Sequence, residues 1–199
     1  REQAVTRAGL HAIGGDPTAR LAYLALGLCG EAGEYARAIG DGLGDEPCLS
    51  ELGDVAWYLA MVEHATGERA RWPSSPSAEG SSPRRLAIVE SACAVAECVK
   101  RPMQGRDLPT DRLRAALADV ATSVALAARF WTGSADGMHA VYAANIAKTK
   151  ARFGDGGFTV AQARALDAEA KRTTREVVRL RLKAAAYSKA AAAMRKGAK

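Results

Sequence analysis

Two stretches of the sequence each place a pair of acidic residues three positions apart in largely apolar surroundings. The first, LCGEAGEYA, contains Glu31 and Glu34, and the second, ELGDVAWYLA, contains Glu51 and Asp54. Residues three apart in an α-helix lie on the same side of it, so each pair shares one helix face. If the two stretches are antiparallel helices joined by a short turn, their four carboxylates converge. This convergence constrains the fold more than any other feature of the chain.

Converging carboxylates repel one another, and burying an unpaired carboxylate is costly, so a divalent cation is the expected counter-ion. The four donors are all oxygen, which predicts Mg²⁺, with Mn²⁺ as a substitute, and disfavours zinc. A di-iron centre of the Glu-x-x-His type is disfavoured because neither Glu31 nor Glu51 has a His three residues later. The competing interpretation is a solvated helix face, which is the usual reason for acids at this spacing.

Two features favour a buried site. Gly33 and Gly53 each lie between paired acids, where glycine costs a helix about 1 kcal/mol relative to alanine. The flanking positions are apolar on almost every side: Leu21, Leu24, Leu28, Leu52, Val55, Leu59 and Val62.

Start and stop signals divide the chain into helices, and no segment alternates apolar and polar residues with period two, so an all-α fold is predicted. Asp16 followed by Pro17 is a helix start signal. Pro102 is expected to end a helix, and Thr110 or Asp111 to cap the next. The expected helices are 1–13, 17–39, 47–66, 84–101, 110–132, 135–153 and a long last helix that opens with a capping-box pattern at residue 159.

The middle of the chain repeats the design of the first two acid-bearing helices. Glu34 is matched by Glu97 at an offset of 63 residues, and Asp54 by Asp119 at an offset of 65. We therefore predict a four-helix-bundle-like core from two tandem helical hairpins, because a single hairpin cannot bury its apolar face. The first hairpin spans about residues 17–67 and the second about 84–153, joined by a Ser- and Pro-rich linker at 71–83; chance similarity between Ala-rich helices is the alternative.

The second copy is degenerate. Ala94 and Ala116 stand where counterparts of Glu31 and Glu51 would be. The sequence thus predicts one acidic centre per chain rather than two.

The C-terminal tail differs in charge from the rest. Residues 171–199 contain ten Lys or Arg and one acid, a balance of +9 in a chain of net charge +6, so the preceding part is mildly acidic. We interpret residues 1–158 as one all-α domain and 159–199 as a basic helical extension. Such an extension can make a weak contact with nucleic acid, or can simply be a solvated end of the chain.

The remaining composition bears on the cellular compartment. Cys29, Cys48, Cys93 and Cys98 show no Cys-x-x-Cys spacing and are interpreted as small core residues in a reducing compartment. The sequence contains no run of eighteen apolar residues, so no membrane-spanning helix is predicted. The sequence as given starts at Arg1 rather than Met and shows no secretory leader, so a cytoplasmic location is expected.

Three motifs together, LALGLCGEAGEYA, ELGDVAWYLAMV and AANIAKTKARFGDGGF, resemble the MazG-like branch of the all-α nucleoside triphosphate pyrophosphohydrolases. The likeness covers about residues 1–68 and 136–158, and the two hairpins resemble the tandem arrangement of the dimeric dUTPase relatives. The resemblance implies Mg²⁺-dependent cleavage of a nucleoside or deoxynucleoside triphosphate to the monophosphate and pyrophosphate, as part of nucleotide-pool control. A homodimer is expected because such hairpins expose apolar faces.

The resemblance also implies roles for single residues. All four acids of the two pairs would be metal ligands at the catalytic centre, while Asn145 and Lys148 would contact the phosphates. The chemistry agrees, since phosphoryl transfer depends on charge neutralisation and alignment. Either Glu34 or Glu31 is a candidate for the base that accepts the proton of the attacking water.

Further side chains are candidates for substrate contact. Arg152, together with Lys150, shares a helix with Lys148, and Arg37 and Lys100 are related by the repeat; an ordinary exposed cation is the alternative for each. Trp57 and Tyr58 follow the acids directly and are candidates for stacking on a base, or are core residues. The alternative function is a catalytically weakened relative that binds nucleic acid or protein through its basic tail.

Overall fold

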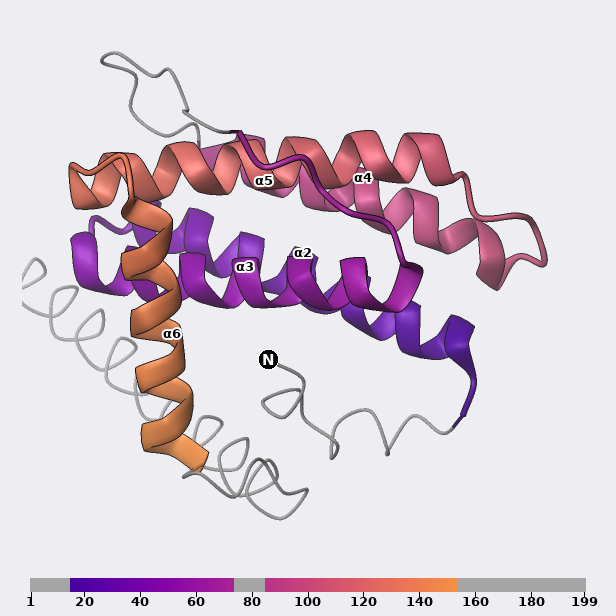
Figure 1. Ribbon diagram of the computed structural model, residues 1–199, viewed down its shortest axis with the longest axis horizontal. Coiled ribbons are helices and arrows are strands. Elements are labelled where there is room, and N and C mark those ends of the chain that lie inside the picture. Colours follow the sequence, from indigo (N-terminus) through magenta and orange to yellow (C-terminus); the bar gives the residue numbers. More distant parts are fainter. Residues whose placement is uncertain (1–14, 74–84, 154–199) are drawn as a thin grey trace, which may run out of the picture. The chain divides into compact units, whose positions relative to one another are not determined.

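The computed structural model describes residues 15–73 and 85–153, and these ranges are all-helical, as predicted. The helices are α2 (Pro17–Gly40), α3 (Asp45–Thr66), α4 (Arg85–Met103), α5 (Thr110–Thr132) and α6 (Gly137–Phe153) (Figure 1). The helices expected at 1–13 and from 159 onward, most of the 71–83 linker and the basic tail lie outside the described residues. The predicted domain boundary at residue 158 lies outside them as well.

Local signals set most helix boundaries. The carboxylate of Asp16 accepts a hydrogen bond of 2.9 Å from the backbone N–H of Thr18, and Pro17 occupies the first turn, so α2 starts as predicted. At the end of α3, Gly67 adopts a left-handed conformation with φ of 73°, which suits glycine because it has no Cβ.

Several predicted boundaries differ from the structure. α3 starts at Asp45, two residues before the predicted start at residue 47. α4 does not end before Pro102 but runs through it to Met103, because a proline so near the end of a helix interrupts little backbone hydrogen bonding. α5 is capped by neither Thr110 nor Asp111: its N-cap position is Pro109, and no side chain there accepts a hydrogen bond from the first turn.

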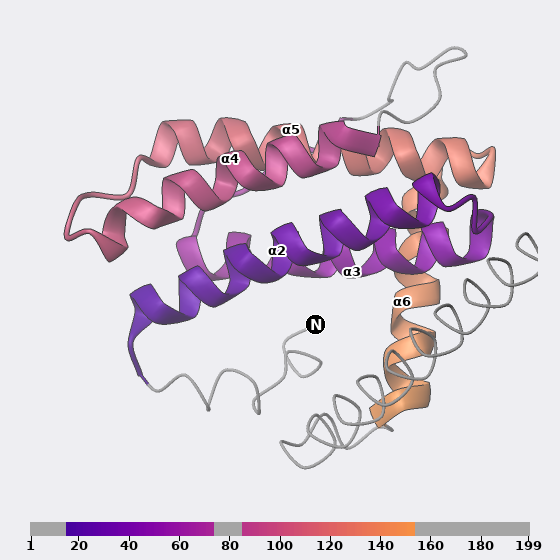
Figure 2. The same cartoon turned by 180° about the vertical axis from the view of Figure 1, so that it is seen from behind.

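The predicted core of two helical hairpins is confirmed. α2 and α3 form one hairpin and α4 and α5 the other, with α2 packed along α4 and α3 along α5 (Figures 1 and 2). Counterpart helices of the two hairpins therefore lie against each other. The seven apolar residues expected to flank the acids are all buried, and the core is completed from the second hairpin mainly by Ile88, Val95, Val99, Leu113, Leu117, Val120 and Val124.

α6 does not belong to either hairpin and crosses the bundle against α3 and α5 (Figure 1). It starts at Gly137, where a Cβ would lie 2.6 Å from the backbone oxygen of Ala128, so the close approach to α5 requires glycine. Among the α6 side chains whose burial the structure describes, Val141 and Asn145 are buried. The crossing brings the motif that contains Asn145 onto α3, the helix that carries two of the acids.

The outer surface bears on three further predictions. In the described part of the chain, no helix is both long and apolar enough to cross a membrane. Several large apolar side chains are exposed, among them Leu26 of α2 at 68% and Ile146 of α6 at 57%. A homodimer interface would bury such side chains. Dimer formation stays a prediction. The expectation that all four cysteines are core residues is wrong for Cys93, which is exposed on α4.

Candidate metal centre

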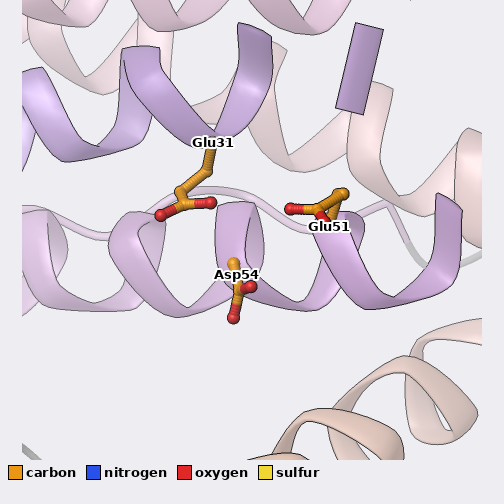
Figure 3. A group of neighbouring side chains, drawn as sticks. All are labelled: Glu31, Glu51 and Asp54. Carbon is orange, nitrogen blue, oxygen red and sulfur yellow. The ribbon is translucent and has the colours of Figure 1, made fainter. Parts of the chain in front are cut away.

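Three of the four predicted acids meet between α2 and α3. Carboxylate oxygens of Glu31, Glu51 and Asp54 all lie within 4.8 Å of one another, and the three side chains are partly buried. Figure 3 shows Glu31 reaching from α2 towards Glu51 and Asp54 on α3. Oxygens bound to one Mg²⁺ at about 2.1 Å lie at most about 4.2 Å apart, so small side-chain movements would let all three share an ion. The group could therefore hold a metal ion.

The fourth acid, Glu34, is not part of this group. Its side chain is exposed, whereas that of Glu31 is partly buried. Residues three apart in a helix share a side but are rotated by about 60°, and this rotation turns Glu34 out of the helix interface. Its negative charge nevertheless raises the pKa of the Glu31 carboxyl, so the two carboxylates are near neighbours.

The environment of Glu31 favours its protonated form. Burial is the main cause, followed by the charges of Asp54, Glu34 and Glu51, and together they raise its pKa to about 7. The ammonium group of Lys148 acts in the opposite direction. This is the electrostatic pattern of carboxylates that are short of positive charge.

Asp54 is held by two side chains of α6, both predicted as site residues. The amide of Asn145 donates a hydrogen bond of 2.8 Å to one carboxylate oxygen, and the ammonium of Lys148 donates to the other. Lys148 also donates to the hydroxyl of Ser50 at 3.1 Å and to its backbone oxygen at 3.3 Å. The structure therefore brings a cation and an amide from α6 to the acid cluster.

Ser50 was missed by the sequence analysis. It lies four residues before Asp54, one helical turn away, and this spacing is the signal that could have found it. Its side chain is partly buried, and both its hydroxyl and its carbonyl accept hydrogen bonds from Lys148.

The two glycines between the acids differ in their surroundings. A Cβ at Gly53 would lie 3.0 Å from the Cβ of Asn145 and 3.1 Å from its amide nitrogen, so glycine there admits α6. At Gly33, an added Cβ would meet nothing within 4 Å beyond its chain neighbours and the adjacent backbone of its own helix. Of these two glycines, only Gly53 is therefore explained by the packing of a neighbouring helix.

The predicted aromatic pair lies beside the acids. The rings of Trp57 and Tyr58 meet edge to face with centroids 4.8 Å apart, and both side chains are partly exposed. Burial is the main cause that raises the pKa of Tyr58. Tyr23 and the negative charges of Glu31 and Asp54 raise it further. The Tyr58 ring is thus adjacent to the acid cluster.

Sequence reasoning missed the feature that places this ring. A Cβ at Gly27 would lie 2.1 Å from the nearest ring carbon of Tyr58, so the ring rests directly on the backbone of α2. Tyr23 precedes Gly27 by one turn and is 44% exposed. Nothing in the spacing of the sequence singled out Tyr23 or Gly27, because their contact with Tyr58 joins two different helices.

The remaining predicted cations lie elsewhere or outside the description. Lys100 forms an exposed ion pair with Glu97 on α4, at 3.3 Å. Arg37 is exposed near the end of α2. The side chain of Arg152 lies outside the described part of the structure.

The second hairpin lacks a matching acid cluster, as its degenerate sequence predicts. Asp119 is exposed on α5, and Ala116 is buried at the position that corresponds to Glu51. Across residues 15–73 and 85–153, the cluster at Glu31 is the only group of three or more His, Cys, Asp or Glu close enough to share an ion.

Comparison of the chain with protein-family models, with curated proteins and with solved structures finds no match.

Proposed function

We propose that the chain is a Mg²⁺-dependent nucleoside triphosphate pyrophosphohydrolase that releases pyrophosphate and a nucleoside monophosphate. The observation that carries the proposal is the meeting of three carboxylates from α2 and α3 with a lysine and an asparagine from α6. The resemblance of the sequence motifs to MazG-like enzymes supports the same reaction. A panel of nucleoside triphosphates would define which bases and sugars are accepted.

Glu31, Glu51 and Asp54 would hold the ion, and their oxygen donors suit Mg²⁺, with Mn²⁺ as a substitute. When bound, Mg²⁺ neutralises phosphate oxygens and lowers the pKa of a bound water. The raised pKa of Glu31 supports this assignment, because carboxylates crowded together without enough positive charge bind an added cation favourably.

Glu34 is the better candidate for the base. It is exposed and lies outside the cluster, yet its charge acts on Glu31. Its carboxylate can therefore accept a proton from a water at the cluster while Glu31 is engaged with the ion. Glu31, the other candidate, would have to serve as ligand and base at once.

The α6 residues would help to bind the triphosphate. Lys148 pairs with Asp54, and its flexible stem would allow the ammonium to turn to a phosphate oxygen. Asn145 orients the Asp54 carboxylate through its amide. Trp57 and Tyr58 offer aromatic surface next to the acids for stacking on a base.

The test is pyrophosphate release from a panel of ribo- and deoxyribonucleoside triphosphates, with Mg²⁺ and with EDTA. Asp54→Asn should lose about 100-fold or more in activity and bind Mg²⁺ weakly, because it removes a ligand. Asp119→Asn is the matched control, since Asp119 is the exposed repeat counterpart of Asp54. Glu34→Gln should lower kcat while Mg²⁺ binding persists.

The proposal fails if no member of the panel releases pyrophosphate. It also fails if Asp54→Asn retains the activity of Asp119→Asn. Loss of Mg²⁺ binding in Glu34→Gln would instead move Glu34 back among the ligands.

A further inference from the structure

The segment that follows α3 is fixed to the bundle at two points. Residues 67–73 form no helix and pass over α5 on the side of the bundle that carries α6 (Figures 1 and 2). The carboxylate of Glu63, which is only 7% exposed, accepts a hydrogen bond of 2.6 Å from the backbone N–H of Ala70. The guanidinium of Arg114 on α5 pairs with the carboxylate of Glu68 at 2.9 Å. Contacts with α3 and α5 therefore set the path of this segment.

The same segment reaches α6 through an aromatic pair. The rings of Trp72 and Tyr142 have centroids 6.5 Å apart and an interplanar angle of 62°. Trp72 is partly buried, and Tyr142 is 39% exposed. Inclined aromatic rings with centroids up to about 7 Å apart attract each other beyond the effect of burial. The indole of Trp72 therefore contacts α6 one turn before Asn145.

This contact lies away from the face of α6 that meets α3. Val141, Asn145 and Lys148 share one face by their spacing, and the last two bind α3 through hydrogen bonds. Among the α6 side chains whose burial the structure describes, Val141 is the buried apolar one, so apolar burial contributes little to holding α6. Tyr142 is rotated by about 100° from Val141. The aromatic pair therefore opposes movements of α6 that the α3 face alone does not restrain.

We propose that Trp72 is a positioning residue for the acid cluster, which acts through Tyr142 to keep Asn145 and Lys148 of α6 on Asp54. The hydrogen bond from Asn145 to Asp54 is 2.8 Å long and is lost beyond about 3.5 Å, so a shift of α6 by less than about 1 Å breaks it. The effect of Trp72 on turnover rests on the proposed function, whereas its effect on α6 does not.

Hydrogen exchange of the full chain in EDTA tests the contact without any activity. In Trp72→Ala, the backbone amides of residues 141–151 should exchange about 3- to 10-fold faster than in the parent, the factor expected for loss of an aromatic pair. Tyr142→Ala should act alike, and adding it to Trp72→Ala should give little further increase. Trp72→Phe keeps an aromatic ring and should restore most of the protection. Arg71→Ala, an exposed neighbour in the same segment, is the matched control and should leave α6 unchanged.

Turnover gives a second readout. Pyrophosphate release by Trp72→Ala should fall by about 3- to 10-fold and recover in Trp72→Phe. In a Lys148→Met background, the same change should cost about twofold or less, because α6 then has no ammonium to place. A change that merely destabilised the protein would instead multiply with Lys148→Met. Trp72→Leu carries the same tests if the alanine variant does not fold.

The proposal is overturned if α6 exchanges equally in Trp72→Ala and Arg71→Ala. Full pyrophosphate release by Trp72→Ala, or losses that multiply in the double variant with Lys148→Met, would overturn it as well. A parent protein that releases no pyrophosphate would remove the proposed function, whereas faster exchange of α6 in Trp72→Ala would still support the contact with α6.

Discussion

The side-chain amide of Asn145 in α6 donates a hydrogen bond of 2.8 Å to the carboxylate of Asp54 in α3. The contact is possible because the residue next to Asp54 is Gly53, over which the Asn145 side chain lies. Lys148, one turn further along α6, donates to the second oxygen of the same carboxylate. α6 therefore fixes the orientation of one of the three acids.

Replacement of Gly53 should disturb this contact. In Gly53→Ala the new Cβ would lie 3.0 Å from the Cβ of Asn145, so the Asn145 side chain must give way by a few tenths of an ångström. Because that side chain is buried and holds Asp54, we expect stability to fall by about 1 to 2 kcal/mol. Gly33→Ala is the matched control: with open space around it, stability should rise by about 0.5 to 1 kcal/mol from helix propensity. Urea unfolding measures both, and equal stabilisation of the two variants would contradict the packing account.

Replacement of Gly27 should displace the aromatic ring beside the acids. The Cβ of Gly27→Ala would overlap the Tyr58 ring at 2.1 Å, and we expect a loss of about 1 to 3 kcal/mol with a raised KM for a triphosphate. Gly30→Ala lies on the same helix with no atom within 4 Å and should be neutral or stabilising. Melting temperatures and substrate titrations would reveal the difference, and an unaltered KM in a folded Gly27→Ala protein would argue against base stacking at Tyr58.

Replacement of Lys148 should strengthen Mg²⁺ binding but slow turnover. Lys148→Met removes the ammonium that pairs with Asp54, so Mg²⁺ should bind the substrate-free protein more tightly. Pyrophosphate release should nevertheless fall by about 10- to 100-fold, because a phosphate contact is lost. Calorimetric Mg²⁺ titration and steady-state kinetics test the two effects. Lys148→Arg, which keeps the charge, should restore part of the activity; weaker Mg²⁺ binding in Lys148→Met would be the contrary result.

Glu31 should make the stability of the metal-free protein depend on pH. Its pKa of about 7 in the folded state lies above the ordinary 4.5, so its favourable contribution is complete below pH 4.5 and is lost as the pH rises to about 7. Since the side chain is partly exposed, we expect the free energy of unfolding to fall by about 1 kcal/mol over this pH range, after allowance for solvent screening. Added Mg²⁺ should therefore stabilise the protein more at pH 8 than at pH 5.

Thermal unfolding between pH 4.5 and 8, in EDTA and in Mg²⁺, measures this dependence. Glu31→Gln should flatten the profile in EDTA, because its amide does not ionise. A parent profile in EDTA as flat as that of the variant would show that the carboxylates are not crowded.

Helix positions and the converging acids were accessible from the sequence because both depend on local signals and helical periodicity. α2 starts at the predicted Pro17, and the apolar neighbours of the acids are buried. The sequence could not separate Glu31 from Glu34, because a rotation of about 60° decides which carboxylate enters the interface, and that rotation is set by packing. Contacts such as Tyr58 on Gly27 join different helices and leave no periodic trace.

The hydrogen bond from Asn145 to Asp54 spans 91 positions of the chain. During synthesis, all the acids therefore emerge from the ribosome well before α6 exists. The nascent hairpin of α2 and α3 must keep its carboxylates hydrated until the second hairpin and then α6 have been made. Formation of the contacts from α6 to Asp54 is thus a late, non-local step of folding.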